Sequence, residues 1–437
     1  MEEFIEDAFN NCTTFFKQSH ANRVACNQRT KPFDSKYTHT LIYVSTTIGA
    51  GSDPVAIFMT IMEIHTFCAI LVVIQLHVFP CVSLTSFVFG DSLVDAGNND
   101  YLFTLSKADS PPYGIDFLPS GGRPTGRFTN GRTIPDIIGQ VLGATSFPPP
   151  CLAPNTTSNA IHEGINYASG ASGILDQTGT FFIGRLTLKE QIGYFEKSRS
   201  YMVNLMGEEK TNELLSKAIF SITIGSNDIL SYFRPSFPFS GDKIAPEVLQ
   251  DHMVSNLTTQ LKRLRWLGAR KFVVVGVGPL GCIPYVRATR LIPEGECSIE
   301  VNSVVRGYNS KLKEGLNRLN REVGFGAVFV YANSYDVFRR MIRNYHQYGF
   351  ENGDGPCCGG YFPPFVCFEG KGKTANASSS FLCSDRAKYV FWDAFHPTEA
   401  ANLIVAEKLL DGDPSVCSPM NIRQLHHSPI IPIHQRS

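Results

Sequence analysis

The chain has 437 residues with 39 basic and 39 acidic side chains, so its formal net charge is zero. Hydrophobic residues make up 43% and charged residues 18% of the sequence, which is typical of a globular protein that buries a sizeable core. A nucleic-acid-binding protein would carry an excess of Lys and Arg, and this balanced charge argues against that class.

The two ends of the chain differ from its middle. Residues 1–58 are mixed and polar without a clear period, and we expect them to lie outside the folded domain, with translation starting at Met59 or Met62. The residues after Cys417 predict a disordered tail over 418–437. The folded domain is therefore expected to span residues 84–417.

An apolar run at residues 66–74 precedes the expected domain. Its length suits the core of a signal peptide and is short for a membrane span. Small residues at 81–83 suit cleavage. We therefore expect residues 59–83 to direct secretion to the extracellular space, and the alternative is an uncleaved membrane anchor over residues 55–79.

The first β-branched and aromatic run, residues 85–89, predicts a buried strand that Gly90 ends in a tight turn. The turn presents Ser92 at the carboxyl end of the strand, where open α/β sheets bind ligands. Asp91 is expected to shape the turn. An ordinary serine in a turn is the alternative, because Val94 departs from the Gly-x-Ser-x-Gly nucleophile elbow.

Two later segments contain groups that suit an oxyanion. Residues 164–173 are rich in small side chains, so their backbone N–H groups can approach a ligand closely. Asn227 offers a side-chain amide just after the predicted strand 218–224. Each segment alone is typical of an ordinary loop. Because Ser92 and Asn227 both follow predicted strands, we expect them to meet at one edge of a sheet.

The middle of the chain alternates between strands and helices. Apolar residues recur at helical spacing over 246–267 and 301–319, and short β-branched runs occupy 271–275 and 327–331. This alternation predicts an α/β fold, in which a parallel sheet is covered by helices on both faces.

Eight cysteines lie in the expected mature chain. An even number indicates disulfide bonds and an oxidising compartment. Cys282 with Cys297, and the group within 357–383, are the expected bridges, although the pairing within the group cannot be read from the sequence. No zinc-binding spacing supports a metal site instead. Acceptor triplets for N-glycosylation begin at Asn155, Asn256 and Asn376.

A serine nucleophile needs a base, and His396 is the histidine that has a suitably spaced carboxylate. Asp393 lies three residues earlier, and the two precede a helix that we expect to run from about Pro397 to Leu410. From there the carboxylate could fix the imidazole tautomer. A capping Asp beside a partly buried His is the alternative. The Gly-, Pro- and Cys-rich residues 350–382 predict a long crosslinked loop near this pair.

Four blocks in this order resemble the plant type of GDSL esterase/lipase, within the SGNH-hydrolase superfamily. They are residues 89–93, 166–170, 225–228 and 393–397, with supporting likeness at 126–132, 278–282 and 357–360. The resemblance runs from about residue 87 to residue 417. It implies a three-layer αβα sandwich with a mainly parallel, flavodoxin-like sheet.

By position, the resemblance implies that Ser92 is the nucleophile, His396 the base and Asp393 its orienting acid. It implies an oxyanion hole made by the backbone N–H groups of Ser92 and Gly170 and the side chain of Asn227, with Gly173 as the alternative glycine. The implied activity is hydrolysis of lipid or other acyl esters through an acyl-enzyme, without a cofactor, a metal or an obligate protein partner. An acyltransferase and an inactive secreted binding protein of the same fold are the alternatives.

Overall fold

A computed structural model of the protein describes residues 84–154, 156, 163–234, 244–323, 326–359, 367 and 382–429. Contacts divide the chain into two units. One comprises residues 84–139 and 144–437, and the fold and the site described below belong to it. The other comprises residues 1–83 and 140–143. The predicted extension and leader, and the acceptors Asn155 and Asn376, lie outside the described residues.

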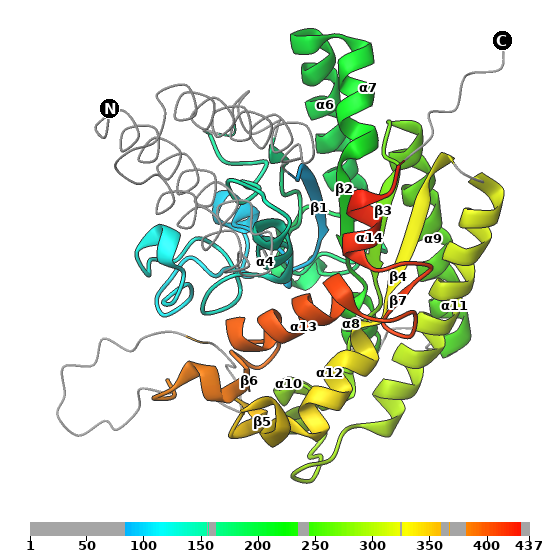
Figure 1. The fold of residues 1–437 in the computed structure, drawn as a ribbon. Helices are drawn as coiled ribbons and strands as arrows, with labels where there is room; N and C mark the ends of the chain where they lie inside the picture. Colours follow the sequence, from blue (N-terminus) through cyan, green and yellow to red (C-terminus); the bar gives the residue numbers. More distant parts are fainter. Residues whose placement is uncertain are drawn as a thin grey trace, which may run out of the picture. The chain divides into compact units, whose positions relative to one another are not determined.

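Five strands form the central sheet in the spatial order β1-β2-β3-β4-β7 (Figure 1). The first four are parallel and in continuous register, and β7 is antiparallel to β4. The four strands predicted in this region are confirmed, each displaced by at most one residue at either end. The observed bounds are β1 Ser86–Gly90, β2 Ile219–Thr223, β3 Lys271–Val275, β4 Val328–Ala332 and β7 Cys417–Ser418.

A short segment on the outer side of β1 gives the sheet its flavodoxin-like order. Asn166 forms one parallel bridge with Val88 and another with Pro150. This segment follows β1 and precedes β2 in the chain, so it counts as strand 2, and β2, β3 and β4 count as strands 3, 4 and 5. Counted in this way, the parallel part of the sheet has the order 2-1-3-4-5. Gly164 permits the close approach, since a Cβ there would lie 1.8 Å from the carbonyl oxygen of Ser86.

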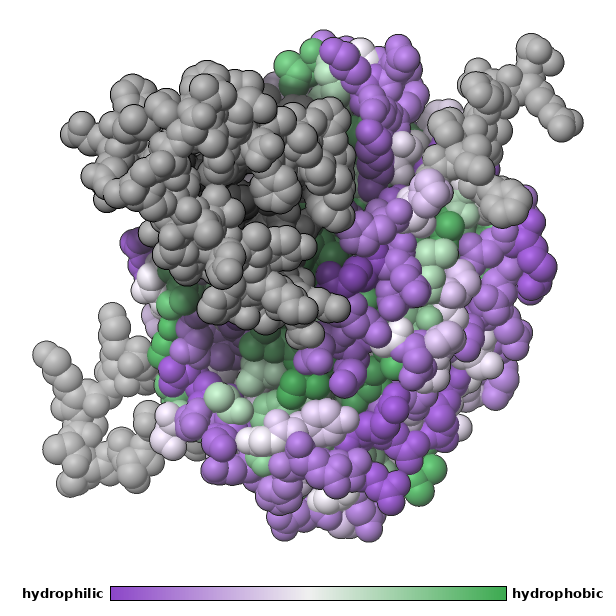
Figure 2. All heavy atoms as spheres, in the orientation of Figure 1, coloured by the Kyte–Doolittle hydropathy of each residue, from purple (hydrophilic) through white to green (hydrophobic). Residues whose placement is uncertain are grey.

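Helices cover both faces of this sheet, so the predicted three-layer α/β sandwich is confirmed (Figure 1). One face carries α6 Leu188–Met206, α9 Pro246–Trp266 and α11 Ile299–Val323, and the other carries α4 Ile134–Val141, α13 Glu399–Asp411 and α14 Ile422–His427. The outward surface of α11 in Figure 2 is mainly hydrophilic, as expected of a helix that buries one side. The remaining α-helices are α7 Glu208–Lys217, α8 Ser226–Tyr232, α10 Pro284–Thr289 and α12 Ser334–Arg343.

A row of four phenylalanines crosses the sheet on the α6 side. Phe87, Phe220, Phe272 and Phe329 occupy paired positions on adjacent strands, and their successive ring centroids are 5.0, 5.8 and 4.4 Å apart. Phe195 of α6 packs 5.3 Å from both Phe87 and Phe220. Packed aromatic pairs stabilise by about 0.5–1.5 kcal/mol beyond simple burial. The row therefore helps to keep the carboxyl ends of β1 and β2 level.

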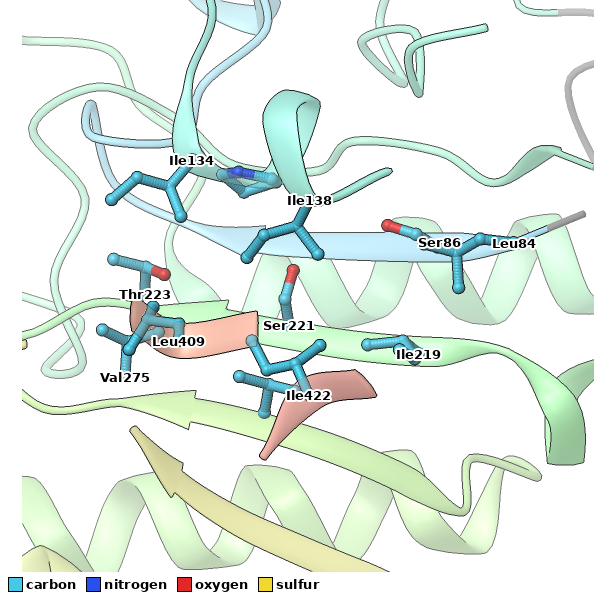
Figure 3. A pocket seen from close by; sticks show the side chains of 12 residues that line it. Leu84, Ser86, Ile134, Ile138, Ile219, Ser221, Thr223, Val275, Leu409 and Ile422 are labelled. Carbon is cyan, nitrogen blue, oxygen red and sulfur yellow. The ribbon is translucent and has the colours of Figure 1, made fainter. Parts of the chain in front are cut away.

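The opposite face encloses a small apolar cavity of about 30 Å³ between the sheet and helices α4, α13 and α14 (Figure 3). Ile138, Leu409 and Ile422 line it from the helices, and Ser86 and Ser221 line it from the sheet. Its lining includes none of the predicted catalytic residues. The cavity is therefore distinct from their site.

The C-terminal region corrects three expectations. The predicted loop 350–382 contains strand β5 Asn352–Pro356, which pairs in parallel with β6 Tyr389–Phe391. The predicted disordered tail contains α14. This helix begins with a reciprocal capping box between Asn421 and Gln424, and two of its apolar side chains are buried. Pro397 precedes Thr398, the N-cap of α13, and so does not open its first turn.

Three disulfides join the described cysteines: Cys282–Cys297, Cys357–Cys383 and Cys358–Cys367. They lie where the sequence predicted bridges. Cys151 and Cys417 are free thiols. Among the described residues, no helix combines the length and the apolar composition that crossing a bilayer requires.

Candidate active site

Three side chains from distant parts of the chain form one hydrogen-bonded line. The Nε2 atom of His396 lies 2.7 Å from the hydroxyl oxygen of Ser92, and its Nδ1 atom lies 2.8 Å from both carboxylate oxygens of Asp393. His396 and Asp393 are buried, whereas Ser92 is half-buried. The arrangement leaves the hydroxyl accessible while the imidazole and the carboxylate are shielded from water, which is the geometry of an activated serine nucleophile.

The carboxylate of Asp393 is surrounded by donors. Oδ1 accepts hydrogen bonds of 2.8 Å from the backbone N–H groups of Phe395 and His396, and Oδ2 accepts one of 2.7 Å from the phenol of Tyr113. Burial alone would raise the pKa of this carboxyl. The neighbouring His396 and these hydrogen bonds outweigh burial, so the pKa of Asp393 is below its usual value.

Backbone pairing holds the Asp393–His396 turn. It follows β6 directly, and the amide of Trp392 donates to the carbonyl of His396 across it. The amides of Cys357 and Cys358 donate to the carbonyls of Phe391 and Trp392, so two disulfide-bonded cysteines lie beside the strand that leads into the turn. The crosslinked region predicted near this pair is therefore in contact with it.

The supporting stretch 126–132 braces the turn from the other side. The ring centroid of Phe128 lies 5.2 Å from that of His396. The hydroxyl of Thr129 donates to the carbonyl of Pro397, and Asn130 accepts a hydrogen bond from the amide of Glu399 at the start of α13. These contacts explain physically why this stretch accompanies the histidine block.

The turn that carries Ser92 is fixed to two strands and a helix. Gly90 pairs with Thr223 of β2, and a Cβ at Gly90 would lie 2.2 Å from the carbonyl oxygen of Thr223. The side-chain amide of Gln191 in α6 both donates to and accepts from the backbone of Gly90. These contacts fix the backbone at Gly90 and therefore the direction in which the turn of Ser92 leaves the sheet.

Asp91 shapes this turn, as the sequence predicted. Its Oδ1 accepts a hydrogen bond from the amide of Leu93, whereas its Oδ2 is buried without a hydrogen-bond partner among the described residues. Burial raises the pKa of Asp91 to about 7, although the bond from Leu93 and the nearby His396 act in the opposite direction.

Asn227 lies in the first turn of α8, just beyond β2. One N–H of its side chain donates to the carbonyl of Ser172 at 2.9 Å. The neighbouring Asp228 fixes the same loop, because it accepts hydrogen bonds from the amides of Ile174 and Leu175. An amide nitrogen carries two hydrogens, so the bond to Ser172 orients the group and leaves its second N–H for a ligand.

The amide of Gly170 is engaged elsewhere. It donates to Oδ2 of Asp95 at 3.0 Å and so does not point freely into the site. A Cβ at this position would lie within 2.8 Å of atoms of Asn99, Phe128 and Ser106. The requirement for glycine here is therefore explained by close packing beside the ring that contacts His396. Among the described residues, the amide of the alternative, Gly173, donates no hydrogen bond.

Two residues that contribute to this geometry did not stand out in the sequence. Tyr113 lies in a Pro- and Gly-rich turn, and only the folded chain brings it to Asp393. Asp95 is fully buried and joins the Ser92 turn to the loop of Gly170. Among the described residues, no group of His, Cys, Asp or Glu side chains could hold a metal ion. Asn256, a predicted glycan acceptor, is exposed on α9.

Comparison with known proteins shows the family. The model of the family described as "GDSL-like Lipase/Acylhydrolase" matches residues 87–409. The chain belongs to this family. It is 64% identical over 348 residues to GDSL esterase/lipase At5g41890 of Arabidopsis thaliana, covering 79% of this chain and 94% of the relative. It is 47% identical over 347 residues to GDSL esterase/lipase At3g50400 of the same plant, covering 78% and 90%. The prediction of a carboxylic ester hydrolase is confirmed at the level of this family.

Replacing Tyr113 with Phe tests its contribution to the site. Removing a hydrogen bond to a charged group costs about 1.5–3 kcal/mol, so we expect kcat on an ester substrate to fall about 10- to 100-fold. The loss also raises the pKa of Asp393 toward its usual value. Tyr308→Phe is the matched control, because it removes a buried hydroxyl without a hydrogen-bond partner among the described residues. An unchanged kcat in Tyr113→Phe would contradict the assignment.

Replacing Asp91 with Asn tests its raised pKa. In the unfolded chain this carboxyl ionises near pH 4, whereas the folded protein holds the proton until about pH 7. Its contribution to the unfolding free energy therefore falls as the pH rises from 4 to 7. We expect the unfolding free energy of Asp91→Asn, measured by chemical denaturation, to rise relative to that of wild type by at least about 1 kcal/mol between pH 4 and pH 8. Asp176→Asn, at an exposed position, should show no such trend, and a constant difference in Asp91→Asn would refute the shift.

Proposed function

We propose that this protein is a secreted serine esterase that cleaves lipid or other acyl esters through an acyl-enzyme on Ser92. The observation that carries the proposal is the continuous line from the Ser92 hydroxyl through His396 to Asp393. Membership of the GDSL-like family and the names of its esterase/lipase relatives support the same reaction class.

In the first half of the reaction, the Ser92 oxygen attacks the ester carbonyl carbon and its proton passes to Nε2 of His396. Asp393 remains ionised, holds the Nδ1–H of the ring and stabilises the imidazolium. The low pKa of Asp393 favours this role. The tetrahedral oxyanion accepts hydrogen bonds from the backbone N–H of Ser92 and from the second N–H of Asn227. The imidazolium then gives its proton to the leaving alcohol.

In the second half, water replaces the alcohol. His396 takes a proton from the water molecule, whose oxygen attacks the acyl carbon, and the collapse of the second tetrahedral intermediate returns the proton to the Ser92 oxygen. The same two donors hold the second oxyanion. Because the amide of Gly170 already donates to Asp95, we assign Gly170 to packing in this mechanism and retain Gly173 as the alternative third donor.

The three disulfides support secretion, since such bonds persist in oxidising compartments. The exposed position of Asn256 is compatible with a glycan there. We therefore propose that residues 59–83 act as a cleaved signal peptide.

The proposed reaction predicts the effects of two substitutions on hydrolysis of a short p-nitrophenyl ester. Ser92→Ala should lower kcat/KM by about a thousandfold or more, because the covalent step is lost. Asn227→Ala should lower kcat about 100-fold with little change in KM, because the bond from its second N–H to the ligand forms only with the oxyanion. The same change also removes the bond to Ser172. Exposed Trp266→Ala serves as the control. Equal rates for wild type and Ser92→Ala would overturn the esterase assignment, and ester products formed with an added alcohol would indicate acyl transfer.

Secretion is tested by expressing the full chain in a eukaryotic secretory host. We expect the protein in the medium to begin near residue 84 by N-terminal sequencing, and an endoglycosidase to reduce its mass. An intact residue 1 on the secreted protein would refute cleavage of residues 59–83. A form retained in the membrane would favour the anchor over residues 55–79.

A further inference from the structure

Five large apolar side chains are exposed on two segments that a backbone bridge joins: Tyr101, Phe103, Leu105, Phe181 and Ile183. We refer to these five residues as the apolar platform. Phe103 is 85% exposed and Phe181 is 69% exposed. Single exposed apolar residues are normal on a protein surface, but a contiguous group marks a surface that binds something apolar.

The platform is built as one unit. Thr104 and Ile183 form an antiparallel bridge, and the carbonyl of Phe182 accepts hydrogen bonds from the amide of Leu105 and the hydroxyl of Thr104. Extended residues alternate between two faces. Here the alternation is inverted, because Phe103 and Leu105 point to solvent while the polar Thr104 between them is buried. The backbone pairing therefore holds these apolar side chains toward solvent.

The backbone of the platform carries strain. Ile183 has a φ of 73°, in the left-handed region that β-branched residues rarely adopt. Strain of this kind persists where the surroundings fix it, and it is enriched at functional positions. Both neighbouring contacts of Ile183, the bridge to Thr104 and the hydrogen bond to Thr180, hold it in place.

The platform connects directly to the site. The side-chain amide of Asn99 donates to the carbonyls of Ser106 and Gly170, and the hydroxyl of Ser169 donates to Asn99. The position of a Gly170 Cβ adjoins the ring of Phe128, which contacts the His396 ring. A body that rested on the platform would therefore lie beside the entrance to Ser92.

Two arginines lie at one edge of the platform. The guanidinium of Arg234 lies 4.7 Å from the ring centroid of Phe181 and 5.3 Å from that of Phe182. Arg185, two residues after Ile183, donates to backbone carbonyls. Within the described part of the chain, neither arginine forms an ion pair with a carboxylate. Among the described residues, the two guanidinium groups therefore face aromatic rings and backbone carbonyls and no carboxylate.

We propose that the apolar platform docks the enzyme on a lipid surface that carries anionic head groups, and that it delivers acyl esters from that surface to Ser92. The delivery step rests on the proposed esterase function, whereas the docking step does not. Apolar side chains inserted at the interface supply most of the binding, and Arg185 and Arg234 add attraction to the anionic head groups.

Docking is tested with the protein as it is secreted, carrying Ser92→Ala, so that the apolar run 66–74 is absent and the lipid is not hydrolysed. Vesicles of phosphatidylcholine with and without phosphatidylglycerol are the probe, and partitioning is measured by flotation. We expect Phe103→Ser with Phe181→Ser to weaken partitioning at least tenfold, and Arg234→Gln to reduce the preference for phosphatidylglycerol. Trp266→Ser is the matched control, because Trp266 is 79% exposed at the end of α9, which leads to the amino end of β3. Thermal unfolding checks that each variant is folded.

The active enzyme supplies a second readout. We expect the ratio of turnover on an aggregated long-chain ester to turnover on a soluble short-chain ester to fall at least tenfold in the double variant. Unchanged partitioning, or an equal loss in Trp266→Ser, would overturn the proposal. So would a dimer of wild type that the double variant abolishes, because the platform would then join two copies of the chain. If wild type hydrolyses neither ester, the esterase proposal fails, while the flotation result still decides the docking proposal.

Discussion

The buried carboxylate of Asp393 is the constraint on which the site depends. A charge that is 2% exposed is unfavourable unless donors surround it. Here the donors come from Phe395, His396 and Tyr113. Two of these residues belong to the same turn, so local geometry provides most of the stabilisation. The phenol of Tyr113 adds a contact 280 residues away in the sequence. The orientation of the His396 ring follows from this arrangement.

The sheet brings the remaining parts together. In the 2-1-3-4-5 order, the outer segment at Asn166 counts as strand 2 and β2 counts as strand 3. The chain therefore leaves β1 toward one side of the sheet and later returns on the other side to form β2. The crevice at such a reversal is where open α/β sheets bind ligands. Ser92 follows β1, the loop of Gly170 follows the outer segment, and Asn227 follows β2. The continuous register between β1 and β2 and the phenylalanine row on the α6 face of the sheet keep these three loops at one level.

The sequence predicted the parts of this arrangement that depend on local pattern. Buried β-branched runs identify the four parallel strands, helical periodicity identifies α9 and α11, and a helix-start signal near Pro397 identifies α13. The predicted residues Ser92, Asp393, His396 and Asn227 all lie at the carboxyl edge of the sheet.

The features that the sequence did not predict depend on tertiary contact. Helix α14 has only six residues and is stabilised by burial of Ile422 and Leu425, which no short pattern reveals. The contact of Tyr113 with Asp393 joins segments whose separation is set by the whole fold. Small residues around Gly170 indicated a close approach to a ligand, but the close approach is to Phe128 and its neighbours, and the amide bonds to Asp95.

The most direct test of the central claim is covalent labelling with a fluorophosphonate, in which an activated serine oxygen forms a bond to phosphorus and fluoride leaves. The account predicts one label per chain, located on Ser92 by peptide mass spectrometry, and a labelling rate that falls about 100-fold or more in His396→Ala. An unlabelled Ser92 in the folded, disulfide-intact protein, or the same rate in both proteins, would contradict it.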